Sequence, residues 1–195
     1  MVRLHAGDLR QVAGNIKLYL TQSGVHKAPY YYALTINLNN EMKEALMDIQ
    51  DTMRTYGVRG RETPEENMHL TLAFIGDYDD PEYVKNIVDS IEIRPFDITL
   101  KGIGAFGDLW WAGIEESAPL QSVARRLRRA LSEADIPFDR KKFSPHITIM
   151  RRANGRLSDA AREEMAGLFG TTMTVDHISL MRSDRGKHGM IYTEL

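Results

Sequence analysis

The stretches HLTLAFIG (69–76) and FSPHITIM (143–150) carry the same His-x-Thr pattern within alternating polar and apolar residues. An alternation with a period of two predicts β-strands. Because residues i and i+2 of a strand point to the same side, His69 shares a face with Thr71, and His146 shares one with Thr148. The apolar residues between them face the opposite side, where we expect them to be buried against helices. Each strand thus presents one imidazole and one hydroxyl on its polar side.

The elements around these two strands also occur twice. An aromatic strand, an amphipathic helix and a polar connector precede each His-x-Thr strand, and a second helix and strand follow it. The apolar faces of the expected helices are Met42, Leu46, Ile49, Met53 and Tyr56; Tyr83, Val84, Ile87, Val88 and Ile91; Leu120, Val123, Leu127 and Leu131; and Leu157, Ala161, Met165 and Leu168. The offsets between Ala33 and Ala112, His69 and His146, and Ile98 and Ile178 are 79, 77 and 80 residues. A nearly constant offset across different element types indicates an internal repeat.

Two copies of one unit in a short chain usually pack about a pseudo-two-fold axis. We therefore expect an α+β fold of two pseudo-symmetric lobes, each an antiparallel sheet with helices on its outer face and an active-site groove between them. The bilobal domain is expected to span residues 30–195. Residues 1–29 form an N-terminal extension in which Leu9, Val12, Ile16 and Leu20 predict one helix packed on the body. The alternative for this extension is a lid over the groove or an oligomer contact.

Composition excludes several classes of protein. The chain has 195 residues, a formal net charge of −2 and no cysteine, so disulfides, thiol nucleophiles and Cys-ligated metals are excluded. A surface that coats long nucleic acid is normally basic, which the balanced charge contradicts for the molecule as a whole. No stretch approaches the run of about 18 apolar residues that spans a bilayer, and no secretory signal is apparent. We therefore expect a cytoplasmic protein without a membrane partner.

The two His-x-Thr pairs limit the chemistry of a shared site. Histidine gives or takes a proton near neutrality, so two imidazoles on opposite sides of a substrate atom can act as acid and base. Threonine hydroxyls can donate to phosphoryl oxygens, and Arg151, three residues after Thr148, can offset developing charge. This set suits an in-line attack on a phosphodiester. Metal binding by His69 and His146 is the rival interpretation, but neither segment supplies a carboxylate. A Ser–His–Asp hydrolase would need a nucleophile elbow that the sequence lacks.

The segments HLTLAFIG (69–76), FSPHITIMR (143–151) and ISLMRSDRGKHGMIY (178–192) together resemble the two-histidine phosphoesterase superfamily. The match is best to its RNA 2′,3′-cyclic phosphodiesterase group, long labelled 2′-5′ RNA ligases, and covers roughly residues 30–195. The resemblance implies a bilobal α+β fold and metal-independent opening of a ribose 2′,3′-cyclic phosphate to a 2′-phosphate, with no cofactor. The implied substrate is an RNA terminus or a small cyclic nucleotide, with no obligate protein partner.

Carried over by position, the resemblance gives each motif residue a role. His69 would protonate the departing 3′ oxygen and His146 would activate water, although these two labels could exchange. Thr71 and Thr148 would hold the phosphoryl oxygens, and Arg151 would assist. The long N-terminal extension and the Tyr-rich first strand, with no Arg before it, depart from the family pattern. These departures concern the substrate, for which an oligonucleotide tail or an ADP-ribose cyclic phosphate is the alternative. Reverse 2′-5′ ligation and a binding module without turnover are separate alternatives.

The remaining histidines and the basic clusters have simpler interpretations. His5, His26, His177 and His188 are expected to be solvated or structural, and Trp110 and Trp111 to pack in the core and at a strand edge. Arg125, Arg126, Arg128 and Arg129, followed by Arg140, Lys141 and Lys142, are typical of a solvated face. This cluster is also the best candidate for steering an RNA end.

Overall fold

The structure of the protein, a computed structural model, describes residues 30–187 and 190–195. The helix expected between Leu9 and Leu20 lies outside these residues, as do His5, His26 and His188. None of the described helices is long and apolar enough to cross a membrane.

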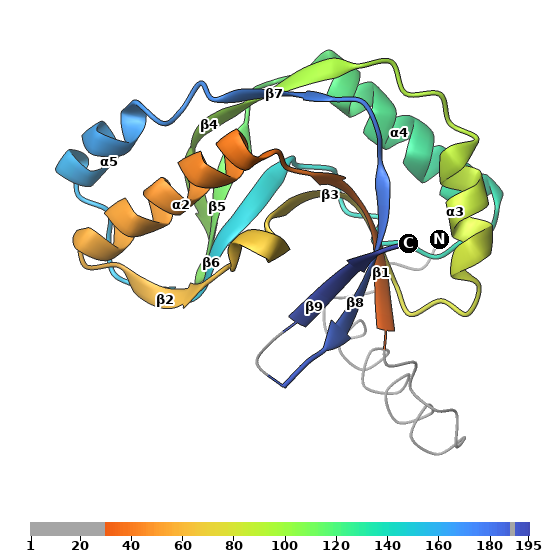
Figure 1. The fold of residues 1–195 in the computed structure, drawn as a ribbon, viewed down its shortest axis with the longest axis horizontal. Helices are drawn as coiled ribbons and strands as arrows, with labels where there is room; N and C mark the ends of the chain where they lie inside the picture. The colour runs from red at the N-terminus through yellow and green to blue at the C-terminus, as the bar shows by residue number, and fades with distance from the viewer. Residues whose placement is uncertain (1–29, 188–189) are drawn as a thin grey trace, which may run out of the picture.

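The strands form one antiparallel sheet in the order β7-β4-β5-β6-β3-β1-β8-β9, with β2 paired to β6 (Figure 1). Their bounds are β1 (Tyr30–Asn37), β2 (Arg59–Glu62), β3 (His69–Gly76), β4 (Phe96–Phe106), β5 (Leu109–Ile114), β6 (His146–Asn154), β7 (Thr172–Val175), β8 (Ser179–Arg185) and β9 (Met190–Glu194). The helices are α2 (Asn40–Thr55), α3 (Pro81–Asp89), α4 (Ala118–Glu133) and α5 (Asp159–Ala166), with a 3₁₀ turn η1 (Glu65–Asn67). The predicted α+β class with antiparallel strands is confirmed.

The two His-x-Thr strands lie side by side at the middle of this sheet. Strand β3 pairs with β6 through Leu70 and Ile147, and this contact joins two groups of strands that the sequence analysis expected as separate sheets. The internal repeat stays a prediction. The register is nevertheless the one that a two-fold axis between Leu70 and Ile147 would produce, because these residues occupy equivalent positions in the two motifs.

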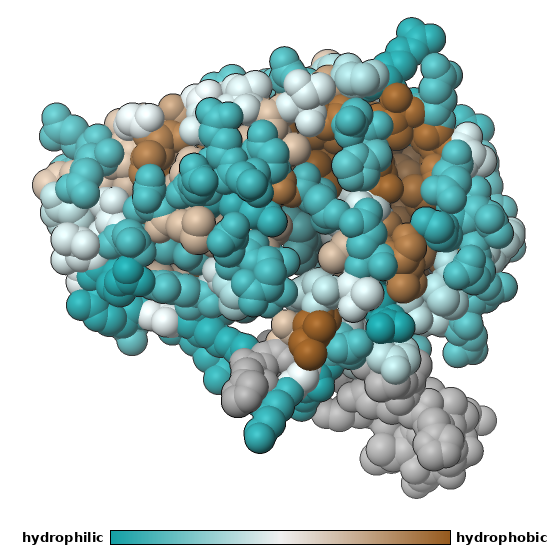
Figure 2. Space-filling model, in the orientation of Figure 1, coloured by the Kyte–Doolittle hydropathy of each residue, from teal (hydrophilic) through white to brown (hydrophobic). Residues whose placement is uncertain are grey.

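Helix α2 packs on the half of the sheet that it does not follow, and α4 packs on strands of both halves. Helix α2 follows β1 but packs on β2, β6 and α5, whereas α4 follows β5 but packs on β3, β4 and α3. In Figure 1, α2 and α5 lie on one side of the molecule and α3 and α4 on the other. Hydrophobic residues gather on the side of α3 and α4 in Figure 2, while hydrophilic residues cover most of the rest of that face.

The helices begin where a polar side chain caps the first turn. The side chains of Asn39, Asp80, Ser117 and Ser158 each accept a hydrogen bond from a backbone N–H three residues later. The apolar residues predicted for α2 and α4 are buried with one exception, Tyr56 at the exposed end of α2. Burial of these helix faces stabilises the sheet from its outer side, which leaves the other side for the polar strand residues.

Four segments differ from the expected strands, one of them β2, which lies in an expected polar connector. The strand expected around Ile178, after the helix that follows the second His-x-Thr strand, is interrupted, because β7 ends at Val175 and β8 begins at Ser179. His177 lies in this connection, exposed and hydrogen-bonded to Asp176, as expected of a solvated histidine. The second His-x-Thr strand begins at His146, immediately after Pro145, which has no N–H to donate to a neighbouring strand. Strand β9 was missed because it is short and mostly exposed.

Candidate active site

A cavity of about 570 Å³ opens over the junction of β3 and β6. The five residues predicted for the site all line it: His69, Thr71, His146, Thr148 and Arg151. The other lining residues are Arg61, Glu62, Thr63, Pro64, Asn67, Phe74, Leu109, Asp139, Lys141, Met190 and Tyr192. We call this space the central cavity.

Strand alternation sends the two histidines and two threonines into the central cavity. Leu70 and Ile147, which lie between them, are completely buried in the hydrophobic core. Neither the Thr71 nor the Thr148 hydroxyl has a hydrogen-bond partner in the described part of the chain. Both hydroxyls can therefore donate to an oxygen of a bound group.

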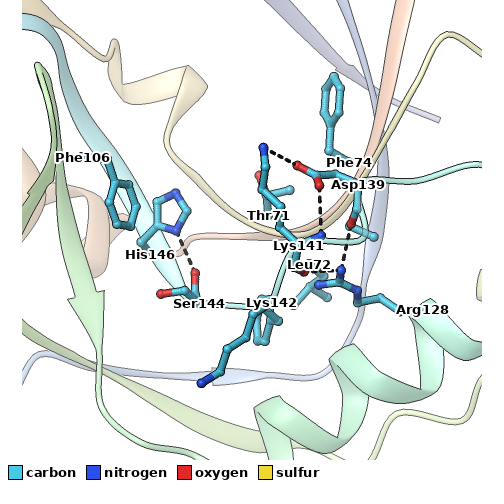
Figure 3. A pocket seen from close by; sticks show the side chains of 12 residues that line it. Thr71, Leu72, Phe74, Phe106, Arg128, Asp139, Lys141, Lys142, Ser144 and His146 are labelled. Carbon is cyan, nitrogen blue, oxygen red and sulfur yellow. Dashed lines mark hydrogen bonds and ion pairs between the residues drawn. The ribbon is translucent and has the colours of Figure 1, made fainter. Parts of the chain in front are cut away.

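Each imidazole hydrogen-bonds to the backbone two residues earlier in the chain. His146 Nδ1 lies 2.8 Å from the carbonyl oxygen of Ser144, two residues earlier (Figure 3). Because a carbonyl oxygen only accepts, Nδ1 carries the proton and Nε2 of the neutral ring keeps its lone pair. The His69 ring hydrogen-bonds to the backbone of Asn67, also two residues earlier.

An aromatic side chain contacts each imidazole. The Tyr192 ring lies 5.0 Å from the His69 ring, centroid to centroid, and the Phe106 ring lies 5.4 Å from that of His146 in an edge-on arrangement. Trp111 supports the second pair, 5.1 Å from Phe106 and 6.1 Å from His146. No local sequence pattern predicts these roles of Phe106 and Tyr192, because the contacts join separate strands.

Arg151 reaches the central cavity because β6 contains a β-bulge. In a regular strand, Arg151 would face away from His146 and Thr148, since it is an odd number of residues from both. Strand β5 pairs Trp111 with Thr148 but Trp110 with Met150, which leaves Ile149 as an extra residue. Ile149 and Met150 are consequently both buried, and Arg151 returns to the cavity side.

Hydrogen bonds from α2 and the β2 segment hold this bulge in place. The buried Gln50 side chain donates from Nε2 to the Ile149 carbonyl at 2.7 Å and to the Thr63 carbonyl at 2.9 Å. The Thr63 N–H also donates to the Ile149 carbonyl, at 2.9 Å. The bulged residue therefore keeps its buried carbonyl satisfied, which makes the orientation of Arg151 a fixed feature of the fold.

Strand β3 contains a bulge at the equivalent place. Strand β1 pairs Thr35 with Thr71 and Leu34 with Ala73, so Leu72 is the extra residue. The side chain brought to the cavity side here is Phe74, which is 47% exposed. The two halves of the site thus place different chemistry, a phenyl ring and a guanidinium, at equivalent positions.

The surroundings of the cavity shift the pKa values of His69 and Asp139. Burial lowers the pKa of His69 below its usual value; the positive charge of Arg151 lowers it further, and the hydrogen bond to Asn67 opposes both effects. The hydrogen bond from the Lys141 backbone, together with the positive charges of Lys141 and Arg128, lowers the pKa of Asp139. This carboxylate is therefore ionised beside Lys141. Residues 30–187 and 190–195 contain no group of three or more His, Cys, Asp or Glu side chains placed to hold a metal ion.

This arrangement can perform acid–base chemistry on a bound oxyanion. It offers two imidazoles for proton transfer, two hydroxyl donors, and a guanidinium held by the bulge in the same cavity.

Comparison with known proteins agrees with this geometry. The sequence pattern of the 2′-5′ RNA ligase superfamily matches residues 41–187. The RNA 2′,3′-cyclic phosphodiesterase of Methanothermobacter thermautotrophicus is 27% identical over 174 residues, which cover 83% of this chain and 94% of that protein. The Thermus thermophilus protein of the same name is 31% identical over 181 residues, covering 85% of this chain and 86% of the relative.

Solved structures show the same fold. The structure of E. coli LigT in its apo form superposes with a TM-score of 0.71 at 22% identity, covering 86% of this chain and 95% of LigT. The family pattern covers most of the chain, and the Thermus relative aligns along most of its own length. The chain therefore belongs to the 2′-5′ RNA ligase superfamily.

Proposed function

We propose that this protein is a phosphodiesterase that opens the 2′,3′-cyclic phosphate of an RNA end or a small nucleotide, leaving a 2′-phosphate. The convergence of both His-x-Thr pairs on one cavity is the observation that carries the proposal. The names of the curated relatives support the same reaction. We also propose a cytoplasmic location, which rests on the sequence expectation alone.

The first step is binding of the cyclic phosphate anion in the central cavity. The Thr71 and Thr148 hydroxyls donate to the two non-bridging oxygens, and Arg151 lies beside the same group. Negative charge on these oxygens increases as a fifth oxygen approaches phosphorus. Donors already in position are therefore worth more in the transition state than in the ground state.

The chemical step exchanges one P–O bond for another. His146 Nε2 takes a proton from water, whose oxygen attacks phosphorus and forms the new P–O bond. The bond from phosphorus to the 3′ oxygen breaks, and His69 gives its proton to that oxygen. The products are a 2′-phosphate and a 3′-hydroxyl, with His146 now protonated and His69 neutral, and solvent restores both. No metal or cofactor takes part in this scheme.

The lowered pKa of His69 must be reconciled with its role as the acid, because the acid has to be protonated. Burial is the main cause of the lowered pKa, and the charge of Arg151, which a bound phosphate neutralises, adds to it. The substrate also places a negative charge beside the ring, and a nearby opposite charge favours the protonated imidazole. We therefore assign the acid to His69 in the substrate complex and the base to His146, whose Nε2 has its lone pair available.

A product assay on 2′,3′-cyclic AMP tests the proposal. The wild type should form 2′-AMP, and both His69→Ala and His146→Ala should lose about 10²–10⁴-fold in kcat. His177→Ala, an exposed histidine away from the cavity, is the matched control and should keep full activity. Activity should persist in EDTA. An absolute need for added metal, or turnover that survives both histidine changes, would overturn the mechanism.

Two of the alternative functions predict different results with the same nucleotides. A binding module would hold 2′-AMP tightly while leaving the cyclic phosphate unopened. Reverse 2′-5′ ligation would use the same two histidines and would appear as a joined product when a 5′-hydroxyl oligonucleotide replaces water.

A further inference from the structure

A second hollow beside the central cavity is lined by positive charge. It has a volume of about 470 Å³ and lies between α4 and the segment that leads to β6. Six cationic side chains line it: Arg125, Arg128, Arg129, Arg140, Lys141 and Lys142. No carboxylate is among its described lining residues, although the whole chain has a net charge of −2. We call this hollow the basic groove.

The basic groove is continuous with the central cavity. A connecting cavity of about 470 Å³ shares Arg128, Lys141 and Lys142 with the groove, and Thr71 and His146 with the catalytic residues. Figure 3 shows these two sets of side chains around the same space. A chain molecule whose end lies between the two histidines can therefore extend into the groove without crossing the protein.

Part of the groove is held in shape by interactions within the protein. Arg128 donates to the backbone carbonyls of Asp139 at 2.8 Å and Lys141 at 2.6 Å. The guanidinium groups of Arg128 and Arg140 lie 5.3 and 5.1 Å from the centroid of the Phe138 ring. These contacts fix the segment that carries Lys141 and Lys142. Arg129 is paired with Glu133 at 2.7 Å and Lys141 with Asp139 at 3.2 Å. The other four cations of the groove repel one another, and a bound polyanion would relieve this repulsion.

We propose that the basic groove binds the phosphodiester backbone of single-stranded RNA upstream of the cyclic phosphate, so that the protein acts on polynucleotide ends in preference to mononucleotides. The inference rests on the proposed function and names its substrate class. A single strand supplies regularly spaced phosphates, and Lys and Arg side chains bind these without reading sequence. A cyclic mononucleotide occupies the central cavity alone and gains nothing from the groove.

The variant that tests this is Arg125→Gln/Lys142→Gln. Both side chains are exposed, and neither makes a hydrogen bond or ion pair in the described part of the chain, so their replacement spares the contacts that shape the groove. The matched control is Arg156→Gln/Arg162→Gln, which also removes two positive charges. These lie near α5, on the other side of the molecule from α4 in Figure 1.

The measurement compares kcat/KM for 2′,3′-cyclic AMP and for an octanucleotide ending in a 2′,3′-cyclic phosphate. At low salt the groove variant should lose about tenfold on the octanucleotide and stay within about twofold on the mononucleotide, because electrostatic attraction is removed only for the longer substrate. The slope of log Kd against log salt for the octanucleotide should become shallower by about 1.4, which is ~0.7 per lost phosphate contact on a single strand. The control variant should match the wild type.

Other results would overturn the inference. Equal losses of kcat/KM on both substrates would place Arg125 and Lys142 in the catalytic machinery. An unchanged kcat/KM on both would show that the groove takes no part in substrate binding. Competition by polyglutamate as strong as that by the octanucleotide would mark a general polyanion surface.

Failure of the proposed function would be seen separately. If the wild type turned over neither substrate, fluorescence anisotropy of a labelled octanucleotide ending in a 2′-phosphate would still test the groove. A Kd that is the same in the wild type and the groove variant would then reject it.

Discussion

Leu70 and Ile147 face each other across the pairing between β3 and β6, and both side chains are completely buried. Each lies between the histidine and the threonine of its own motif. Side chains directly opposite in an antiparallel pair lie on the same face, so this apolar pair occupies the outer side while the histidines and threonines occupy the cavity side. The contact that joins the two halves of the sheet is therefore also the one that sets the separation of the catalytic groups.

Shortening this apolar pair should destabilise the fold. Leu70→Ala is expected to lower the free energy of unfolding by about 2–5 kcal/mol, and Ile147→Val by about 0.5–1.5 kcal/mol, because each leaves a cavity in the core. Urea denaturation of the two single variants and the double variant measures both values and their coupling. Strictly additive losses would show that the two side chains do not act as a contacting pair.

The guanidinium of Arg151 should stabilise the negative charge that develops on the phosphoryl oxygens. Arg151→Gln is expected to lower kcat by about 10²–10³-fold, the usual effect of removing a donor to developing negative charge. Arg151→Lys should restore only part of this loss, since an ammonium group cannot reproduce the planar guanidinium.

Gln50 should behave as a positioning residue for Arg151. Gln50→Leu removes one hydrogen bond to the bulged Ile149 and one to Thr63, which itself donates to Ile149. The change should lower kcat in the wild-type background and alter it little in the Arg151→Gln background. A double-mutant cycle on kcat, with thermal melting as a check on folding, measures this dependence. Equal effects of Gln50→Leu in both backgrounds would show a general structural role instead.

The pH dependence of catalysis should differ between the free protein and its substrate complex. The acid must be protonated, so activity falls as pH rises through the pKa of His69. That pKa is lowered in the free protein and rises when the phosphate anion binds. The descending limb of kcat should therefore lie at higher pH than that of kcat/KM, because the two profiles report the complex and the free protein respectively.

A substrate with sulfur in place of the 3′ oxygen tests which histidine is the acid. A thiolate leaves without protonation, so this substrate should rescue His69→Ala and leave His146→Ala inactive. Rescue of His146→Ala alone would exchange the two roles.

His69 should also make the stability of the fold depend on pH. Because its pKa is lower in the folded state than in the unfolded state, the unfolded chain binds a proton first as pH falls below about 6.5. Stability is thus greatest above this pH and decreases toward the lowered pKa. His69→Asn should reduce the difference between Tm values at pH 7.5 and pH 5.5, whereas His177→Asn, at an exposed position, should not.

Local sequence determined the parts of the site that depend on neighbours along the chain. Strand alternation set the common face of each histidine and its threonine, and helical periodicity with its caps set α2 to α5. The constant offset between the motifs predicted that they would meet. These features follow from side-chain direction in regular strands and helices, which a single segment encodes.

Tertiary structure alone decided the rest. The placement of Arg151 and Phe74 on the cavity side depends on extra residues opposite β5 and β1, and Gln50 reaches the bulge from a helix about a hundred residues away in sequence. Tyr192, Phe106 and Lys141 join the site through strands and loops that pair only in the folded chain. The lowered pKa of His69 likewise arises from burial, which no local pattern records. Backbone pairing between distant segments determines all of these contacts. A bulge also reverses the alternation of side chains beyond it, and this alternation is what a sequence uses to predict the face on which each side chain lies.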